Sequence, residues 1–252
     1  MVFFCNNLAW AKSSEETIRE SAYEQEEQKS EVKYRTAFGN CPSRPAGVLT
    51  LRLIKDFEKH HSLKELKELI LKEKLKERHY LSSYNIKYDP FKSMLKFEYE
   101  CPWPLMRTQV YKRGGMDSYE AILVDNGDLF DPTFEVVLRD ESKLEGALPS
   151  LALPVESLNS ELRQRIAKLM LKSPINLRTK ISEVIIDNNN DMTVILSLNG
   201  RTSNAFLGKE SWEDKFQKLQ RLVNYFDSSK KAPATIYMHN SKKVVVKFGD
   251  KS

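Results

Sequence analysis

Alternating apolar and polar residues run through the last third of the chain and predict a sheet there. The segment 191–198 places every second residue on one face: Met192, Val194, Leu196 and Leu198. Similar segments lie on either side, at 181–187 and 201–208. A period of two is typical of strands, and the connections "NNN" and Asn199-Gly200 are typical of hairpin turns. We therefore expect a three-stranded meander.

Helical spacing predicts three helices. The stripe from Ser211 to Phe226 recurs every three or four positions, at Trp212, Phe216, Leu219, Val223 and Phe226. An aromatic stripe with this period faces a core. A second helix is expected from Ser62, which forms a capping box with Glu65. A third is expected after a cap at Ser160.

The first half of the chain predicts a small α+β unit. It consists of a strand at Val48–Ile54, the helix that begins near Ser62, and the strands "SSYNIKY" and "SMLKFEYECP". In the last of these strands, alternate residues share one face: Leu95, Phe97 and Tyr99.

A second, larger unit begins at "EAILVDNGDLFDPTF". Ala121–Val124 predicts a strand, Asn126-Gly127 favours a type I′ turn, and "LPSLALPV" predicts an extended segment. Three aspartates lie here: Asp125, Asp128 and Asp131. They lack the twelve-residue spacing and the closing glutamate of a calcium loop. We interpret them as turn residues and predict no metal site.

The chain closes with "ATIYMHNSKKVVVKF", which predicts a last hairpin. In its second strand Val244, Val246 and Phe248 alternate with Val245 and Lys247. Six lysines and two aspartates lie between Asp227 and Lys251. Two interpretations of these lysines remain: they protect an exposed strand from aggregation, or they attract an acidic partner, nucleic acid or membrane.

Composition indicates a soluble, mildly basic chain. It has 252 residues, 40% of them hydrophobic, and a net charge of +5. No run of about 18 to 20 apolar residues is present. "MVFFCNNLAWAK" ends in an A-x-A pattern and is interpreted as the end of an export segment or as an unimportant terminus. Residues 12–45 are polar and predict a flexible arm.

Candidate chemistry is sparse in the sequence. Cys41 and Cys101 either form a disulfide in an oxidising compartment or remain free thiols. His60, His61 and His79 flank the helix that begins near Ser62, and His239 lies in a turn. No nucleophile, phosphate-binding or dinucleotide motif is present. We therefore expect no catalytic residue and no cofactor.

The order of segments resembles the FtsQ/DivIB family of bacterial cell-division proteins. The resemblance lies in "AILVDNGDLFD", "LPSLALPV", "ISEVIIDNNNDMTVILSLNGRTSNAFLGKESWEDKFQKLQRLVNYF" and "ATIYMHNSKKVVVKF". It extends back through "YNIKYDPFKSMLKFEYECPWPLM", which is similar to the family's POTRA domain. Residues from about 46 to 248 are covered, and the C-terminal half carries most of the specificity.

The resemblance implies a non-enzymatic divisome scaffold. Such proteins hold FtsB- and FtsL-like partners on the extracytoplasmic side of the inner membrane, at the division site, and help to regulate septal peptidoglycan synthesis. The implied contact is strand addition at the last strand, helped by the preceding helix. By motif, the expected partner-binding residues are Lys243, Val244, Val245, Val246, Lys247 and Phe248. No nucleic acid or small-molecule substrate is expected.

These observations predict an α+β fold with four parts. They are an export-signal or anchor remnant at 1–11, a flexible arm at 12–45, a POTRA-like β-α-β-β domain at 46–112, and an FtsQ-type β domain at 113–252, mostly antiparallel and flanked by helices. Membrane association is expected only through a segment missing from, or cleaved from, this chain. Another POTRA-type peptide-binding adaptor of the cell envelope is the alternative; an undetected cell-wall hydrolase and a basic nucleic-acid binder are weaker ones.

Overall fold

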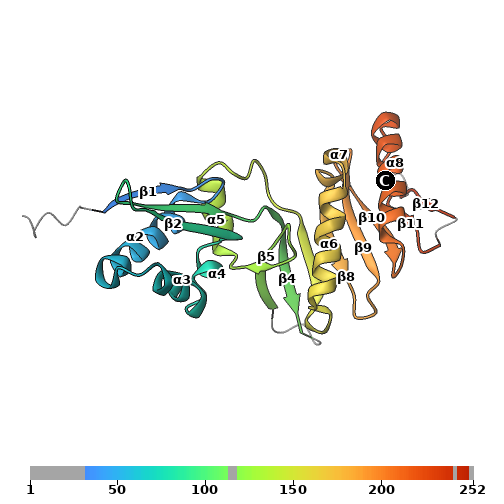
Figure 1. Cartoon of the computed structure of the whole chain (residues 1–252). Coiled ribbons are helices and arrows are strands. Elements are labelled where there is room, and N and C mark those ends of the chain that lie inside the picture. The colour runs from blue at the N-terminus through green and yellow to red at the C-terminus, as the bar shows by residue number, and fades with distance from the viewer. Residues whose placement is uncertain (1–31, 113–117, 241–242, 250–252) are drawn as a thin grey trace, which may run out of the picture.

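The structure is a computed structural model that describes residues 32–112, 118–240 and 243–249. These residues form a three-stranded sheet and a nine-stranded sheet. In Figure 1 the two sheets lie side by side along an elongated molecule, with α5 between them. The predicted α+β class is confirmed. The predicted export segment at 1–11 lies outside the described residues. In the ranges that are described, no helix combines the length and the apolar character that crossing a bilayer requires.

The smaller sheet belongs to an N-terminal unit in which helices separate the first strand from the other two. Its elements are β1 (Lys33–Ala37), α2 (Ser43–His60), α3 (Leu63–Lys72), α4 (Leu75–Arg78), β2 (Ser83–Asp89) and β3 (Met94–Glu100). β3 is central, parallel to β1 and antiparallel to β2. The Ser62 cap is confirmed by the Glu65 N–H that its side chain accepts at 3.3 Å. Leu95, Phe97 and Tyr99, which were predicted to share one face of this strand, are all buried.

The strand predicted at Val48–Ile54 is wrong, because these residues lie inside α2. Leucines at positions 49, 51 and 53 alternate, which suggested a strand. Only Leu49 and Leu53, one helical turn apart, are buried, whereas Leu51 is 69% exposed. A helix satisfies that burial pattern and a strand does not.

The predicted boundaries of the N-terminal unit also need correction. Residues from Lys33 onward, assigned to the flexible arm at 12–45, form β1 and the start of α2. At the other end, Pro104–Tyr111 forms β4 of the larger sheet, although it lies in the range predicted for the small domain. The change from one sheet to the other therefore falls between Glu100 and Pro104.

The larger sheet has the strand order β12-β11-β10-β9-β8-β7-β4-β5-β6 among the described residues. Its strands after β4 are β5 (Ser118–Val124), β6 (Leu129–Phe130), β7 (Ser150–Pro154), β8 (Ile181–Ile186), β9 (Met192–Leu198), β10 (Arg201–Gly208), β11 (Thr235–Tyr237) and β12 (Val245–Lys247). The helices are α5 (Thr133–Asp140), η1 (Val155–Ser157), α6 (Ser160–Lys172), α7 (Ile175–Arg178) and α8 (Trp212–Ser229). The predicted meander corresponds to β8, β9 and β10.

Helices α6 and α8 lie against one face of this sheet (Figure 1). Side chains from α6, α7 and α8 share one core cluster with the meander strands. The stripe predicted for α8 is confirmed, since each of its five members is at most 4% exposed.

Two turn and cap predictions are wrong in detail. Asn126-Gly127 is not a type I′ turn, because that turn needs positive φ at both residues and only Gly127 has it, at 85°. Asn199 and Gly200 do both have positive φ, at 50° and 76°. The cap of α6 is Asn159, whose side chain accepts the Leu162 N–H at 2.7 Å, rather than Ser160.

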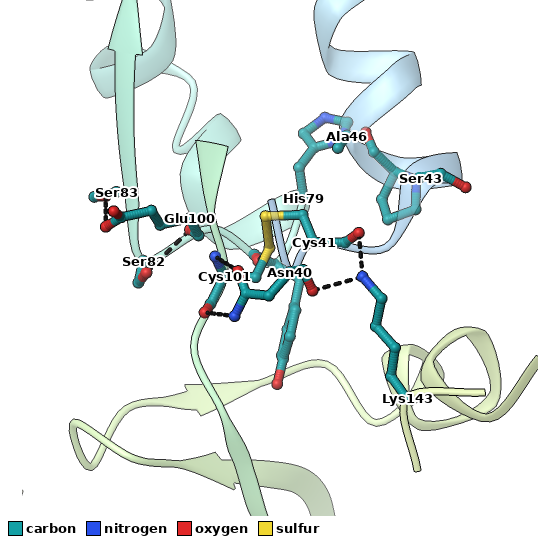
Figure 2. Close-up of a disulfide and its surroundings, with 12 residues drawn as sticks. Asn40, Cys41, Ser43, Ala46, His79, Ser82, Ser83, Glu100, Cys101 and Lys143 are labelled. Atoms are coloured by element: carbon teal, nitrogen blue, oxygen red, sulfur yellow. Dashed lines mark hydrogen bonds between the residues drawn. A yellow bond between two sulfur atoms is a disulfide. The ribbon is translucent and has the colours of Figure 1, made fainter. Parts of the chain in front are cut away.

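A disulfide joins Cys41 to Cys101, which decides between the two alternatives left by the sequence. Figure 2 shows the bond beside Asn40, whose side chain donates to the Cys101 carbonyl at 2.8 Å and accepts its N–H at 2.9 Å. Lys143, which follows α5, donates to the carbonyls of Asn40 and Cys41. The disulfide therefore lies where the two sheets meet.

Candidate partner-binding edge

Strand β12 is an edge strand. It pairs with β11 alone among the described elements, in an antiparallel register that sets Lys247 against Thr235 and Val245 against Tyr237. An edge strand leaves one side of its backbone without ladder partners. The six residues predicted to bind a partner, Lys243 to Phe248, all lie in or beside this strand.

Side chains on the two faces of β12 have different environments. Val244 and Val246 pack against the large core, whereas Val245 and Lys247 are exposed. The Lys247 ammonium lies 5.3 Å from the centre of the Tyr237 ring, on the face of the sheet opposite the helices. The core-facing valines hold the strand in place, and its outer side has no ladder partner among the described elements.

Phe248 connects the edge to α8. Its ring meets Phe226 edge-on at 6.3 Å, and it remains 54% exposed. Phe226 is the last residue of the buried α8 stripe. Because that stripe is buried, a partner can contact α8 only through outward residues such as Tyr225, which is 56% exposed.

Sequence reasoning missed a group of cations beside the edge. A hollow of about 590 Å³ lies between the β9–β10 turn, the end of α8 and the residues after β12, and Arg201, Lys230 and Lys231 line it. Arg201 and Lys230 are far apart in sequence and belong to no recognisable motif. Only the concentration of lysines after Asp227 pointed to this region.

Asp128 and Asp131 take part in local hydrogen bonds. The Asn126 side chain accepts the Asp128 N–H at 2.9 Å, and the Asp131 carboxylate accepts the Thr133 N–H at 2.8 Å at the start of α5. Within the described part of the chain, no three His, Cys, Asp or Glu side chains are placed to share a metal ion.

Two other titratable side chains are accounted for by packing. His79 Nδ1 lies 2.8 Å from the Pro45 carbonyl, and burial lowers the pKa of this histidine. Lys215, in the first turns of α8, is only 3% exposed and donates to the Leu207 carbonyl at 2.6 Å. Burial also lowers the pKa of Lys215. Both groups connect helices to neighbouring backbone, and neither lines the hollow beside β12.

Comparisons with known proteins identify the larger unit. The family model "Cell division protein FtsQ/DivIB, C-terminal" matches residues 113–245. No curated protein matches the chain. Among solved structures, the major extracytoplasmic domain of the cell-division protein DivIB from Geobacillus stearothermophilus, in its trans isomer, is similar over 53% of this chain and 98% of its own length. Its identity is 12% and its TM-score 0.31, so the family assignment rests on the family model, which covers more than half of the chain. The chain belongs to the FtsQ/DivIB family of cell-division proteins, whose members are non-enzymatic scaffolds of the division machinery.

Proposed function

We propose that this protein is an extracytoplasmic divisome scaffold that binds FtsB- and FtsL-like partners by strand addition at β12 and so helps to regulate septal peptidoglycan synthesis. The observation that carries the proposal is the position of β12: it ends the sheet of a division-family chain, and its outer backbone has no ladder partner among the described elements. An extended segment can satisfy such an edge through main-chain hydrogen bonds, and side-chain contacts then set specificity.

The charge of the edge supports an acidic partner. Lys243 and Lys247 are exposed, and neither forms an ion pair within 4 Å with a described residue. Positive charge at a rim accelerates encounter with an acidic segment and makes binding sensitive to salt.

Two further observations support the cellular setting. The Cys41–Cys101 disulfide suits an oxidising, extracytoplasmic compartment. The N-terminal unit has the order β1-α2-α3-α4-β2-β3 with β3 central, and we assign it as the POTRA domain that the sequence resemblance implies. The scaffold would then carry this domain ahead of the β domain that holds the partner.

Proline substitutions in β12 test the proposal. Successive residues of a strand direct their N–H groups to opposite sides, so only one of Val245→Pro and Val246→Pro removes a donor from the open edge. The other weakens pairing with β11, and circular dichroism and thermal unfolding distinguish them. We expect the variant that keeps its fold to bind the extracytoplasmic domain of the FtsB-like protein of the same organism at least about tenfold more weakly by calorimetry.

Two companion variants complete the experiment. Lys243→Glu with Lys247→Glu changes only exposed side chains and should also weaken binding. Lys87→Pro in β2, an edge strand of the smaller sheet, is the matched control and should leave affinity unchanged if it folds. Unaltered binding by the folded β12 proline variant and by the double glutamate variant would contradict the proposal. Loss of binding in Lys87→Pro alone would favour a peptide-binding POTRA adaptor.

A further inference from the structure

The hollow beside β12 is a basic pocket with an apolar wall. Its cations are Arg201, Lys230 and Lys231, all exposed, and its apolar side includes Ala232 and Phe248. None of the residues that line it is acidic. Among the described residues, none of the three cations has a carboxylate within 4 Å, and the nearby Asp227 is paired with Lys180 at 3.3 Å. Within the described ranges, the pocket therefore presents positive charge that no carboxylate neutralises.

The backbone around the pocket is held in place. Asn199, in the β9–β10 turn, donates through its side chain to the carbonyls of Phe226 and Lys231, at 3.2 and 3.0 Å. This joins the turn that carries Arg201 to the end of α8 that carries the two lysines. The cations thus project from a fixed frame, and a ligand would not have to order the backbone when it binds.

Lys230 occupies a position that usually belongs to glycine. The N–H of Lys230 bonds the Asp227 carbonyl and the N–H of Lys231 bonds the Phe226 carbonyl, which is the Schellman arrangement at a helix C-terminus. Lys230 has φ of 52° there, a conformation that glycine adopts far more easily than any residue with a side chain. A lysine at this position makes the left-handed backbone conformation less favourable than a glycine would, but it places a positive charge at the pocket.

The pocket adjoins the end of the open edge strand. Lys247 is the last residue of β12, and the next two residues, Phe248 and Gly249, line the hollow. A partner strand that pairs with Val245–Lys247 and continues past Lys247 therefore reaches Phe248 and Gly249 within one or two residues, and a turn across the end of β12 toward β10, two strands inward, brings it to Arg201. Its backbone would lie along the edge, and its terminal side chains would lie between the cations and the Phe248 ring.

We propose that this pocket binds a carboxylate of the partner strand, either an acidic side chain or a chain terminus, placed just beyond the residue that lies beside Lys247. This inference rests on the proposed strand addition and adds a determinant of specificity to it. Charge complementarity argues for the acidic group, and the Phe248 wall accommodates the aliphatic part of the same segment.

Charge reversal tests the pocket. We expect Arg201→Glu with Lys231→Glu to weaken binding of the same FtsB-like domain at least about tenfold and to reduce the dependence of its affinity on salt. The matched control is Lys92→Glu with Lys209→Glu, the same change of net charge at exposed lysines outside the pocket. The control should bind nearly as the unmodified chain does. Replacing the partner's matching acidic residue by lysine should restore binding to the reversed pocket.

Lys230→Gly separates binding from folding. It removes one pocket charge and supplies the residue that the αL position favours, so the melting temperature should rise while affinity falls by a few fold. A purely structural role for Lys230 would leave affinity unchanged.

The outcomes distinguish this inference from the function on which it rests. If the proline variant of β12 loses binding but the reversed pocket binds as its control does, the pocket inference is wrong and strand addition stands. If neither change weakens binding, strand addition itself is wrong. The last outcome concerns membranes. If the unmodified chain sediments with vesicles that contain phosphatidylglycerol, and the Arg201→Glu, Lys231→Glu variant does not but keeps its affinity for the partner, the pocket is a membrane contact and the inference is overturned.

Discussion

The two edge strands of the larger sheet, β6 and β12, differ in whether another part of the chain covers them. At one edge β6 is two residues long, and Phe130 packs at 4.9 Å against Tyr80 of the N-terminal unit. At the other edge no described element covers β12, and Phe248 remains 54% exposed. Native proteins usually cover or blunt an exposed sheet edge. The edge that meets the N-terminal unit is covered, whereas no described element covers β12, so the structural junction is separate from the edge that we propose binds a partner.

The covered edge is part of a continuous second core. This cluster includes buried residues of the N-terminal unit, such as Leu49, Leu53 and Phe97, together with Ile122, Val124, Phe130, Phe134 and Leu138 of the larger unit. Glu141 adds a polar connection, since its carboxylate accepts the backbone N–H groups of Ser43 and Arg44 at the start of α2. Changes in this region should therefore affect stability strongly and binding weakly, and changes at β12 should do the reverse.

Removing the disulfide should have the largest effect on stability. The sequence separation of Cys41 and Cys101 is 60 residues, and closing a loop of that size stabilises a fold by about 4 kcal/mol in the chain-entropy treatment. We expect Cys41→Ala with Cys101→Ala to lose roughly this amount in urea unfolding and to retain affinity for a β12 partner. Reduction of the unmodified protein should give the same loss. A loss below about 1 kcal/mol would show that packing alone holds the junction.

Tyr99 should make stability depend on alkaline pH. Burial raises the pKa of Tyr99 to about 12, from the usual 10.0. Because the pKa is raised in the folded state, the contribution of Tyr99 to the free energy of unfolding is fully present below pH 10. It is lost as the pH rises toward 12 and the tyrosine ionises in the unfolded chain. Two pKa units correspond to about 2.7 kcal/mol. The difference in unfolding free energy between the unmodified protein and Tyr99→Phe, measured after rapid pH jumps, should fall across this window. A constant difference would contradict the assignment.

The sequence predicted the helices and strands correctly where a regular spacing of apolar residues marks a face that another element buries. Leu219, Val223 and Phe226 lie on one stripe of α8, and Val194 and Leu196 share a core with them, so both patterns point to one arrangement. The alternating leucines of α2 led to the wrong prediction of a strand, because positions 49 and 53 fit a period of two as well as one helical turn. Burial, which separates the two periods, depends on tertiary packing.

Other features had no local signal. β1 has the sequence KYRTA, with no buried residue, and it is held by parallel pairing with β3. No apolar face therefore marked it as a strand. Similarly, the edge of β12 could be predicted from its alternation and its place in the family order, whereas the pocket beside it requires residues from a turn, a helix end and a strand end. The fold alone brings these together.

Tyr80→Phe should change the free energy of unfolding by less than loss of the disulfide does, and in the opposite direction. The Tyr80 hydroxyl is buried at the covered edge and has no hydrogen-bond partner among the described residues. A buried hydroxyl without a partner costs on the order of 1 kcal/mol or more, so its removal should stabilise the protein by about 1 kcal/mol. Tyr99→Phe at neutral pH is the matched control, because it removes a hydroxyl that accepts from Thr50 at 3.1 Å, and it should destabilise. Equal effects of the two substitutions would rule out this account of Tyr80.

Phe248→Ala should have the smallest effect on stability and a clear effect on binding. The ring is 54% exposed and makes one aromatic contact, with Phe226, so its loss should destabilise the fold by only about 1 kcal/mol, well below the 3–5 kcal/mol typical of a buried phenylalanine. A half-exposed aromatic at the end of an open strand can bury its free surface against a partner, and such residues often dominate binding energy. We expect at least about a tenfold loss of affinity by calorimetry. A stability loss typical of a buried ring, without a change in affinity, would show that Phe248 completes the core and that the two edges differ less than their exposure indicates.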